Sequence, residues 1–109
     1  MANSFYPAAT KALAEQRRAL APACEDAFQA FSRQVFVEGA LSPKIKQLIA
    51  VAVAHVTQCP YCIRGHTRAA QAQGATPEEI MEAIWVAAEM RAGAAYAHAA
   101  IALDAMKEE

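Results

Sequence analysis

The chain has 109 residues, of which 56% are hydrophobic and 19% charged, and its formal net charge is −1. This length predicts a single domain over residues 1–109, near the size at which association often supplements a small core. With no basic block, neither nucleic acid nor an anionic membrane is favoured as a partner. The apolar run at residues 48–56 is too short to span a bilayer, and no signal-peptide pattern is present, so we expect a cytoplasmic protein.

Two helices are expected near the N-terminus, after an irregular start at residues 1–6. Pro7, at a first-turn position, opens a segment of helix-forming residues that ends at Leu20. Pro22 marks a second start, and apolar side chains at helical spacing then predict a helix that stops at Gly39. These side chains are Phe28, Phe31, Val35 and Phe36.

The next helix is expected to be the centre of the fold. Ser42 and Pro43 form a good N-cap and N1 pair, which opens a helix that runs to about Thr57. Between residues 48 and 56 the only strongly polar side chain is His55. We therefore expect this helix to be buried nearly all round, in a central helix hairpin.

The last helical region has the strongest start signal in the sequence. Thr76, Pro77 and Glu79 match a capping box with proline at the first helical position. Gly93 is expected to kink this helix or to separate it from a final helix that ends near Met106.

These elements predict an all-α protein of five or six helices joined by short turns. The N-terminal helices take up about residues 7–38, and the core of the domain takes up about residues 42–106. Alanine is concentrated between Ala83 and Ala105, and the helices carry more apolar surface than one small core can bury. We therefore expect a homo-oligomer.

Two cysteines and a histidine form the main chemical motif, Cys59-Pro60-Tyr61-Cys62 followed by His66. Thiols at positions i and i+3 of a helical turn can close a disulfide after a small adjustment. Pro60 places both cysteines at a helix N-terminus, where backbone N–H groups stabilise a thiolate. His66 follows Cys62 by four residues, so an imidazole lies within reach of that thiol.

Several interpretations of this motif stay open. A redox dithiol is one, and a pair of inert buried thiols is another. A metal site would need about four ligands, for which the candidates are Cys59, Cys62, His66 and His55. A redox sensor that only toggles its disulfide is a further interpretation, and Cys24 is most simply a buried or semi-buried free thiol. No nucleotide or flavin signature is visible, so no cofactor is expected.

The segment from Ser42 to His98 resembles the alkylhydroperoxidase D-like family, also called the carboxymuconolactone decarboxylase-like superfamily. The resemblance rests on the Leu-Ile-Ala-Val-Ala-Val-Ala run, the Cys-Pro-Tyr-Cys motif with His66, and the segment Gly-Ala-Thr-Pro-Glu-Glu-Ile. It implies an all-α fold, trimers or hexamers, and thiol-dependent peroxidase activity. The decarboxylase branch, which acts on lactones, typically lacks the cysteine pair and is less favoured.

The resemblance also implies roles for individual residues. Cys62 would be the thiolate that attacks peroxide, Cys59 would resolve the product, and His66 would help to deprotonate Cys62. An external dithiol or thioredoxin-like protein would then reduce the disulfide. Family members carry a proton-relay glutamate twelve residues before the first cysteine, where this chain has Gln47, which cannot take a proton. Other candidates for the relay are His55, Glu89, His98 and Tyr61.

Overall fold

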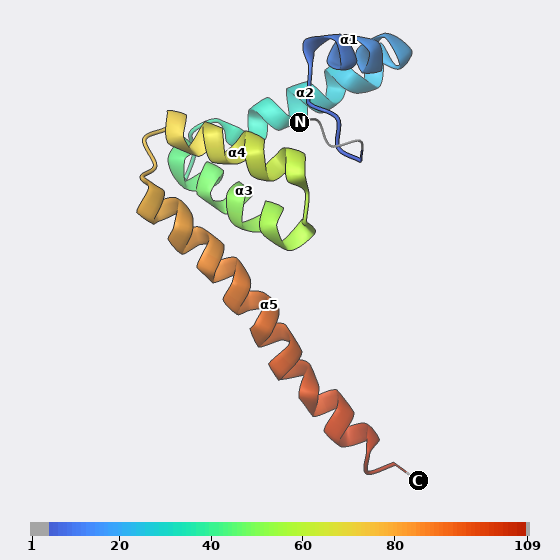
Figure 1. Ribbon diagram of the computed structural model, residues 1–109, viewed down its shortest axis with the longest axis vertical. Helices are drawn as coiled ribbons and strands as arrows, with labels where there is room; N and C mark the ends of the chain where they lie inside the picture. The colour runs from blue at the N-terminus through green and yellow to red at the C-terminus, as the bar shows by residue number, and fades with distance from the viewer. Residues whose placement is uncertain (1–4, 109) are drawn as a thin grey trace. The chain divides into compact units, whose positions relative to one another are not determined.

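The computed structural model describes residues 5–108, and within them the chain forms five helices and no strand (Figure 1). The helices are α1 (Lys11–Leu20), α2 (Pro22–Phe36), α3 (Pro43–Thr57), α4 (Pro60–Ala72) and α5 (Pro77–Ala105). The predicted all-α class is confirmed. Residues 1–4, part of the expected irregular start, lie outside the described residues. Two compact units divide between Lys46 and Gln47. The single domain over residues 1–109 stays a prediction.

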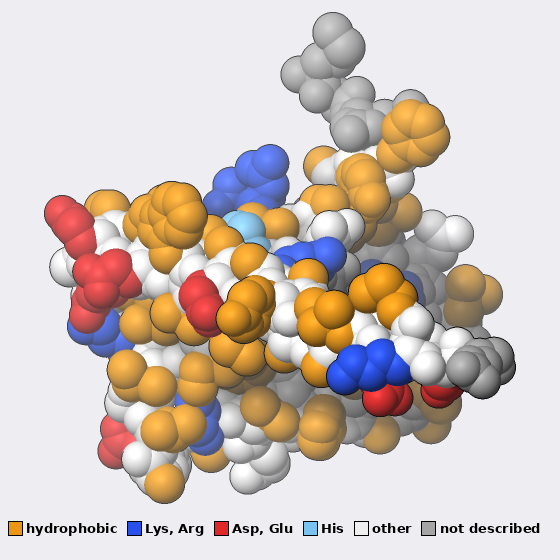
Figure 2. Space-filling view, turned by 90° about the horizontal axis from the view of Figure 1, so that it is seen from below, with side chains coloured by type: hydrophobic (Ala, Val, Ile, Leu, Met, Phe, Trp, Pro, Cys, Tyr) orange, Lys and Arg blue, Asp and Glu red, His pale blue; other side chains and the backbone are white. Residues whose placement is uncertain are grey.

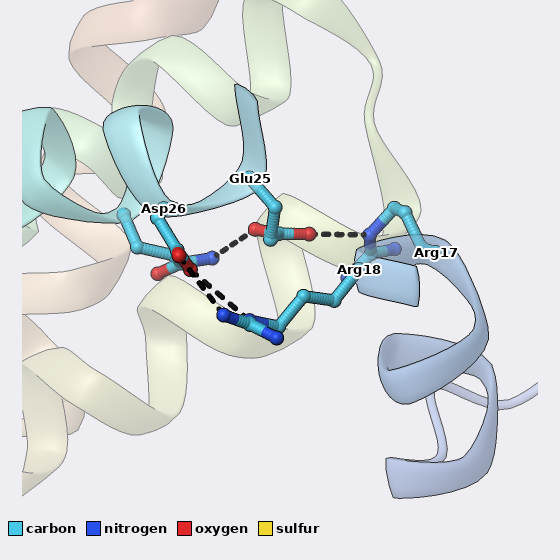
Figure 3. A network of polar contacts seen from close by, with 5 residues as sticks. Arg17, Arg18, Glu25 and Asp26 are labelled. Carbon is cyan, nitrogen blue, oxygen red and sulfur yellow. Dashed lines mark hydrogen bonds and ion pairs between the residues drawn. The ribbon is translucent and has the colours of Figure 1, made fainter. Parts of the chain in front are cut away.

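Charged side chains join α1 to α2 within the first unit (Figure 3). Arg18 donates from Nε and Nη2 to the two carboxylate oxygens of Asp26, at 3.0 and 2.9 Å. Glu25 accepts from Arg17 Nε at 3.2 Å and from Gln29 Nε2 at 2.9 Å. The bond to Asp26 raises the pKa of Arg18, and the bonds from Gln29 and Arg17 lower the pKa of Glu25. Solvent screens such surface pairs, so they fix how the two helices meet more than they stabilise the fold.

The first helix starts later than the sequence predicted. The helix begins at Lys11 and not near Pro7, because Thr10 acts as its N-cap. The backbone N–H of Leu13 donates to Thr10 Oγ1 at 3.2 Å. A threonine that caps an otherwise unpaired N–H group is a stronger start than a proline three residues earlier.

The second helix ends earlier than predicted, at Phe36 and not at Gly39. The side chain of Lys46 explains this earlier end. Its Nζ donates to the carbonyl oxygens of Val35, at 2.9 Å, and Val37, at 2.6 Å. A cation bound to the last carbonyls of a helix satisfies acceptors that the helix itself leaves open.

The second unit has a small apolar core, where α3, α4 and the start of α5 meet. Its buried members are Val51, Ala70, Ala75 and Ile80, with Leu48 and Ile84 packed against them. Burial of α3 is one-sided: Val51 is fully buried, whereas Val53 is 52% exposed. The expectation that residues 48–56 are buried nearly all round therefore fails within the single chain, because the neighbouring helices cover only one face.

A turn at Gly74 follows the end of α4. Gly74 has a φ of 90°, in the left-handed region that glycine adopts without strain. The N–H of Gly74 donates to Gln71 O and the N–H of Ala75 donates to Ala70 O, both at 2.9 Å. These two bonds form a Schellman motif, and they bring Ala75 into the core beside Ala70.

The last helix, α5, is longer than predicted. Its N-cap is Thr76, and the predicted capping box with Glu79 is confirmed. The helix continues through Gly93 to Ala105 without the expected break, because one glycine costs a helix only about 1 kcal/mol. Figure 1 shows the second half of α5 extending past α3 and α4. None of the helices within residues 5–108 is long and apolar enough to cross a membrane.

Many large apolar side chains of the described residues are exposed, and hydrophobic side chains are spread across the surface in Figure 2. On α5 they include Trp85, Met90, Tyr96, Ile101 and Leu103, and the C-cap residue Met106 is exposed as well. Tyr96, for example, is 85% exposed. Such a surface is typical of a helix that packs against another chain.

Candidate functional site

The two cysteines of the motif lie together at the start of α4. Cys59 is the N-cap residue, and its sulfur accepts a hydrogen bond from the backbone N–H of Cys62 at 3.3 Å. The two Sγ atoms share a hydrogen bond at 2.7 Å, and both thiols are free. The predicted position of the pair at a helix N-terminus is confirmed. Only a short movement separates these sulfurs from a disulfide.

The hydrogen bond between the two thiols shifts their pKa values in opposite directions. The hydrogen bond with the Cys62 side chain, and the backbone N–H groups of Cys62 and Tyr61, lower the pKa of Cys59. The hydrogen bond with Cys59, together with burial, raises the pKa of Cys62. In the resting pair the charge therefore favours Cys59, and Cys62 keeps its proton.

His66 lies one turn after Cys62 on α4, and it meets Gln47 from α3. The distance from His66 Nδ1 to Gln47 Oε1 is 2.8 Å. An amide oxygen only accepts, so in this orientation the ring carries its proton on Nδ1, and Nε2 is the accepting nitrogen. Both side chains are half-buried. Gln47 thus orients the ring of the candidate base, at the position where the family resemblance implies a glutamate.

His55 is held by its own helix. Its Nδ1 lies 2.7 Å from Val51 O, and because a carbonyl only accepts, Nδ1 is the donor. The half-buried ring is therefore fixed two turns after Gln47 on α3. A part for His55 in a proton relay stays a prediction.

The other relay candidates lie at or near the surface. Tyr61 is 44% exposed in the first turn of α4, and its backbone N–H is one of the groups that lower the pKa of Cys59. Glu89 and His98 are exposed on α5. The Glu89 carboxylate lies along its own helix, beside Gly93 one turn later. A Cβ added at Gly93 would lie 3.3 Å from Glu89 Oε1. Their predicted roles also remain predictions.

Two features of the turn before Cys59 were not predicted from the sequence. Arg91 of α5 donates from Nη1 to the carbonyl oxygen of Val56 at 2.8 Å, and so ties α5 to the end of α3. Gln58, directly before Cys59, has a φ of 58° in the left-handed region. Arg91 and its acceptor are 35 residues apart, so no local pattern could have paired them.

The alternative metal site needs four ligands close together. Among residues 5–108, no three side chains of His, Cys, Asp or Glu form a group that could hold a metal ion. The proposed set of Cys59, Cys62, His66 and His55 is therefore not assembled in this conformation.

Comparison with known proteins places the chain in a family. Residues 22–105 match the model of the carboxymuconolactone decarboxylase family. A protein of Paracoccus denitrificans, named uncharacterized protein 4 in cox locus, is 62% identical over 108 residues, which cover 99% of this chain and 96% of that protein.

Two solved structures are also similar. One, from Methanobacterium thermoautotrophicum, is 37% identical with a TM-score of 0.70 and covers 74% of this chain and 91% of its own. The other, a carboxymuconolactone decarboxylase family protein from Legionella pneumophila in its apo form, is 34% identical with a TM-score of 0.71 and covers 86% and 84%. The all-α fold, the matched family model and these relatives agree, and the chain belongs to the carboxymuconolactone decarboxylase family.

Proposed function

We propose that this protein is a thiol-dependent peroxidase, also able to reduce disulfides, in which Cys62 attacks and Cys59 resolves. The main support is the sulfur pair itself: two reduced thiols 2.7 Å apart, at a capped helix N-terminus. The opposite pKa shifts support different tasks for the two sulfurs. A charged Cys59 is ready to attack an oxidised neighbour, while Cys62 reacts only after it loses its proton.

The proposed reaction moves two electrons from the dithiol to the peroxide. The Cys62 thiolate attacks the terminal oxygen of R–O–OH, the O–O bond breaks, and the alkoxide leaves as ROH after taking a proton. Cys62 is then a sulfenic acid, and the Cys59 thiolate attacks its sulfur and expels hydroxide, which leaves as water. The Cys59–Cys62 disulfide remains. An external dithiol or thioredoxin-like protein reduces it by thiol–disulfide exchange.

The proposed base is His66. It must take the proton of Cys62, because the contact with Cys59 holds that proton on the sulfur. The hydrogen bond to Gln47 keeps Nδ1 as the donor, so Nε2 is the nitrogen that accepts. The neutral amide does not stabilise the resulting imidazolium as a carboxylate would. We therefore expect a slower proton transfer than with glutamate at this position.

We also propose that the protein works as a homo-oligomer, either a trimer or a hexamer. The support is the exposed apolar surface of α5, which includes Tyr96, Ile101 and Leu103. Covering such a surface removes apolar area from water, at roughly 25 cal/mol per Å². Sedimentation at several protein concentrations tests this proposal, and a species with the mass of one chain throughout would contradict it.

The central experiment follows free thiols and peroxide together. Wild-type protein should consume peroxide in the presence of a small dithiol, and Cys62→Ser should abolish turnover. In the Cys59→Ser variant the reaction should stop after one attack on peroxide. Dimedone should then trap a sulfenic acid on Cys62, and peptide mass spectrometry can locate the label. Cys24 is a free thiol as predicted, but it is exposed and not buried or half-buried. It provides the matched control, because Cys24→Ser should change neither result.

Other outcomes would contradict the proposal in distinct ways. A trapped sulfenic acid on Cys59 in the Cys62→Ser variant, at the wild-type rate, would reverse the roles of the two sulfurs. A disulfide that forms without turnover in any dithiol would indicate a redox sensor. About one zinc per chain, with unreactive thiols, would indicate the metal-binding alternative.

A further inference from the structure

An open groove of about 530 Å³ lies along one side of α4. Its lining residues are Pro60, Ile63, Arg64, Thr67, Arg68 and Gln71. They recur at helical spacings, so they share one face of the helix. Arg68 lies two positions before Ala70, which is fully buried, and two positions correspond to about 200° around a helix. The groove therefore faces away from the core, on a side of α4 separate from Cys62 and His66.

Two arginines make this groove cationic. Arg64 and Arg68 are both exposed, and neither forms an ion pair with any part of the chain that the structure describes. No Asp or Glu occurs in residues 39–77, so α3 and α4 carry only basic charges. Pro60 and Ile63 offer carbon surface at the other end of the groove. An occupant that fits this order has two anions one helical turn apart and an apolar group beyond them.

The complementary order occurs on α5 of the same chain. Glu78, Glu82 and Trp85 follow one another at spacings of four and three, so they share one face of the helix, which we call the acidic stripe. Both glutamates lie two positions from Ile80, which is buried, so the acidic stripe points away from the core. Glu78 and Glu82 are exposed, and within residues 5–108 neither forms an ion pair. Trp85, the single tryptophan of the chain, is 66% exposed.

We propose that the groove of α4 binds the acidic stripe of a second copy of this chain, with the two helices antiparallel. Arg68 then meets Glu78 of the second copy. Arg64 meets Glu82, because the two arginines and the two glutamates have the same spacing of four residues, or about 6 Å along a helix. Trp85 of the second copy lies one turn further and covers the apolar end of the groove. Arginine–carboxylate pairs and buried tryptophans are among the strongest contacts at protein interfaces.

A second copy is the occupant that this chain itself provides, since every copy carries one groove and one acidic stripe. Sites that hold a drug-sized ligand measure roughly 300–1,000 Å³, so the groove has room for an indole ring. The groove and the stripe are different surfaces, so the contact closes in a reciprocal pair or in a ring of copies. This inference rests on the homo-oligomer proposed above and goes further, because it names the two surfaces that meet.

Exchanging one pair of charges tests the interface. Arg64→Glu and Glu82→Arg should each weaken association by about tenfold or more, because like charges then face each other. A chain that carries both substitutions should associate as the wild type does, since the two charges are again opposite. Sedimentation at several protein concentrations measures all three variants. Arg33→Glu reverses an exposed charge on α2 and should leave association unchanged.

The outcomes separate this inference from the homo-oligomer itself. A wild-type protein that stays a single chain at every concentration would refute both. An oligomer that forms equally well in the wild type and in Arg64→Glu would overturn the proposed interface and leave the oligomer standing. Weak association of the doubly substituted chain, with a native circular dichroism spectrum, would also overturn the pairing of Arg64 with Glu82.

The fluorescence of Trp85 gives a second test, because no other tryptophan contributes to the signal. In the associated wild type, acrylamide should quench this fluorescence severalfold less than in Arg64→Glu at the same concentration. The emission of the wild type should also shift to shorter wavelength as association proceeds. Equal quenching of Trp85 in the associated and dissociated protein would overturn its place in the groove.

A fluorescent polyglutamate peptide tests for a different acidic partner. The assembled wild type should not bind this peptide, because each groove is already filled by α5 of another copy. Saturable binding to the assembled wild type, lost in Arg64→Gln/Arg68→Gln, would show that the groove stays open for another acidic protein. That result would overturn the proposal.

Discussion

Gln47 Oε1 lies 2.8 Å from His66 Nδ1, and this contact joins two residues that are 19 positions apart in the chain. The amide oxygen accepts, so the imidazole keeps its proton on Nδ1 and Nε2 becomes the accepting nitrogen. A carboxylate in the same place would make the same hydrogen bond and add a negative charge. The difference between orienting a base and stabilising its protonated form can therefore be tested at one residue.

Gln47→Glu should raise kcat/KM for peroxide by roughly tenfold, because a carboxylate stabilises the imidazolium that forms when His66 takes the Cys62 proton. Gln47→Leu, of similar size but with no acceptor, should lower kcat/KM by a similar factor. Steady-state peroxide consumption measures both. Equal rates in the two variants would show that the contact has no part in the reaction.

The two motif thiols should differ in their response to pH. The pKa of Cys59 is lowered and that of Cys62 is raised, so as pH rises Cys59 should become a thiolate before Cys62 does. Iodoacetamide reacts with the thiolate, so alkylation near pH 7 should label Cys59 first, and labelling of Cys62 should increase only at higher pH. Peptide mass spectrometry after short pulses gives the two rates. Labelling of Cys62 first would contradict the resting arrangement.

Replacing the hydrogen-bond partner tests the cause of this difference. Cys62→Ala removes the side chain whose contact contributes most to lowering the pKa of Cys59. The alkylation midpoint of Cys59 should therefore move to higher pH in this variant. Cys24→Ala, away from the motif, should leave the midpoint where it is in the wild type. An unchanged midpoint in Cys62→Ala would show that the backbone N–H groups alone hold the charge.

The left-handed backbone at Gln58 predicts opposite changes in stability for two substitutions. Gln58→Gly should stabilise the fold by up to about 1 kcal/mol, because glycine adopts a φ near 58° without the clash of a Cβ. Gln58→Val should destabilise it by about 1–2 kcal/mol, since a branched side chain tolerates this conformation poorly. Urea denaturation measures both. A loss of stability in the glycine variant would contradict the strained turn.

The one-sided burial of α3 predicts different costs at neighbouring valines. Val51→Ala should lower the free energy of unfolding by about 2 kcal/mol, because Val51 is fully buried and its methyl groups fill the core. Val53→Ala, on the same helix but 52% exposed, should cost much less. Equal losses would show that the open face of α3 is covered in the folded protein.

Local signals in the sequence were enough for most of the fold. Ser42 and Pro43 open α3, and the capping box at Thr76 opens α5, as predicted. The ends of helices depend on side chains that satisfy nearby N–H groups, so a pattern of a few residues is sufficient to locate them. The two errors in the N-terminal helices have different causes. Thr10 is a local cap that starts α1 after Pro7, whereas Lys46 binds the end of α2 from a position about ten residues further along the chain.

The sequence by itself determined that Cys59 and Cys62 begin a helix and that His66 follows one turn later, because these relations need only the geometry of a helix. Only the tertiary structure decided that Gln47 orients His66 and that Arg91 ties α5 to the end of α3. These contacts join residues far apart in the chain, and their formation depends on how the helices pack around a shared core. Packing is a property of the whole folded unit, so no short pattern encodes it.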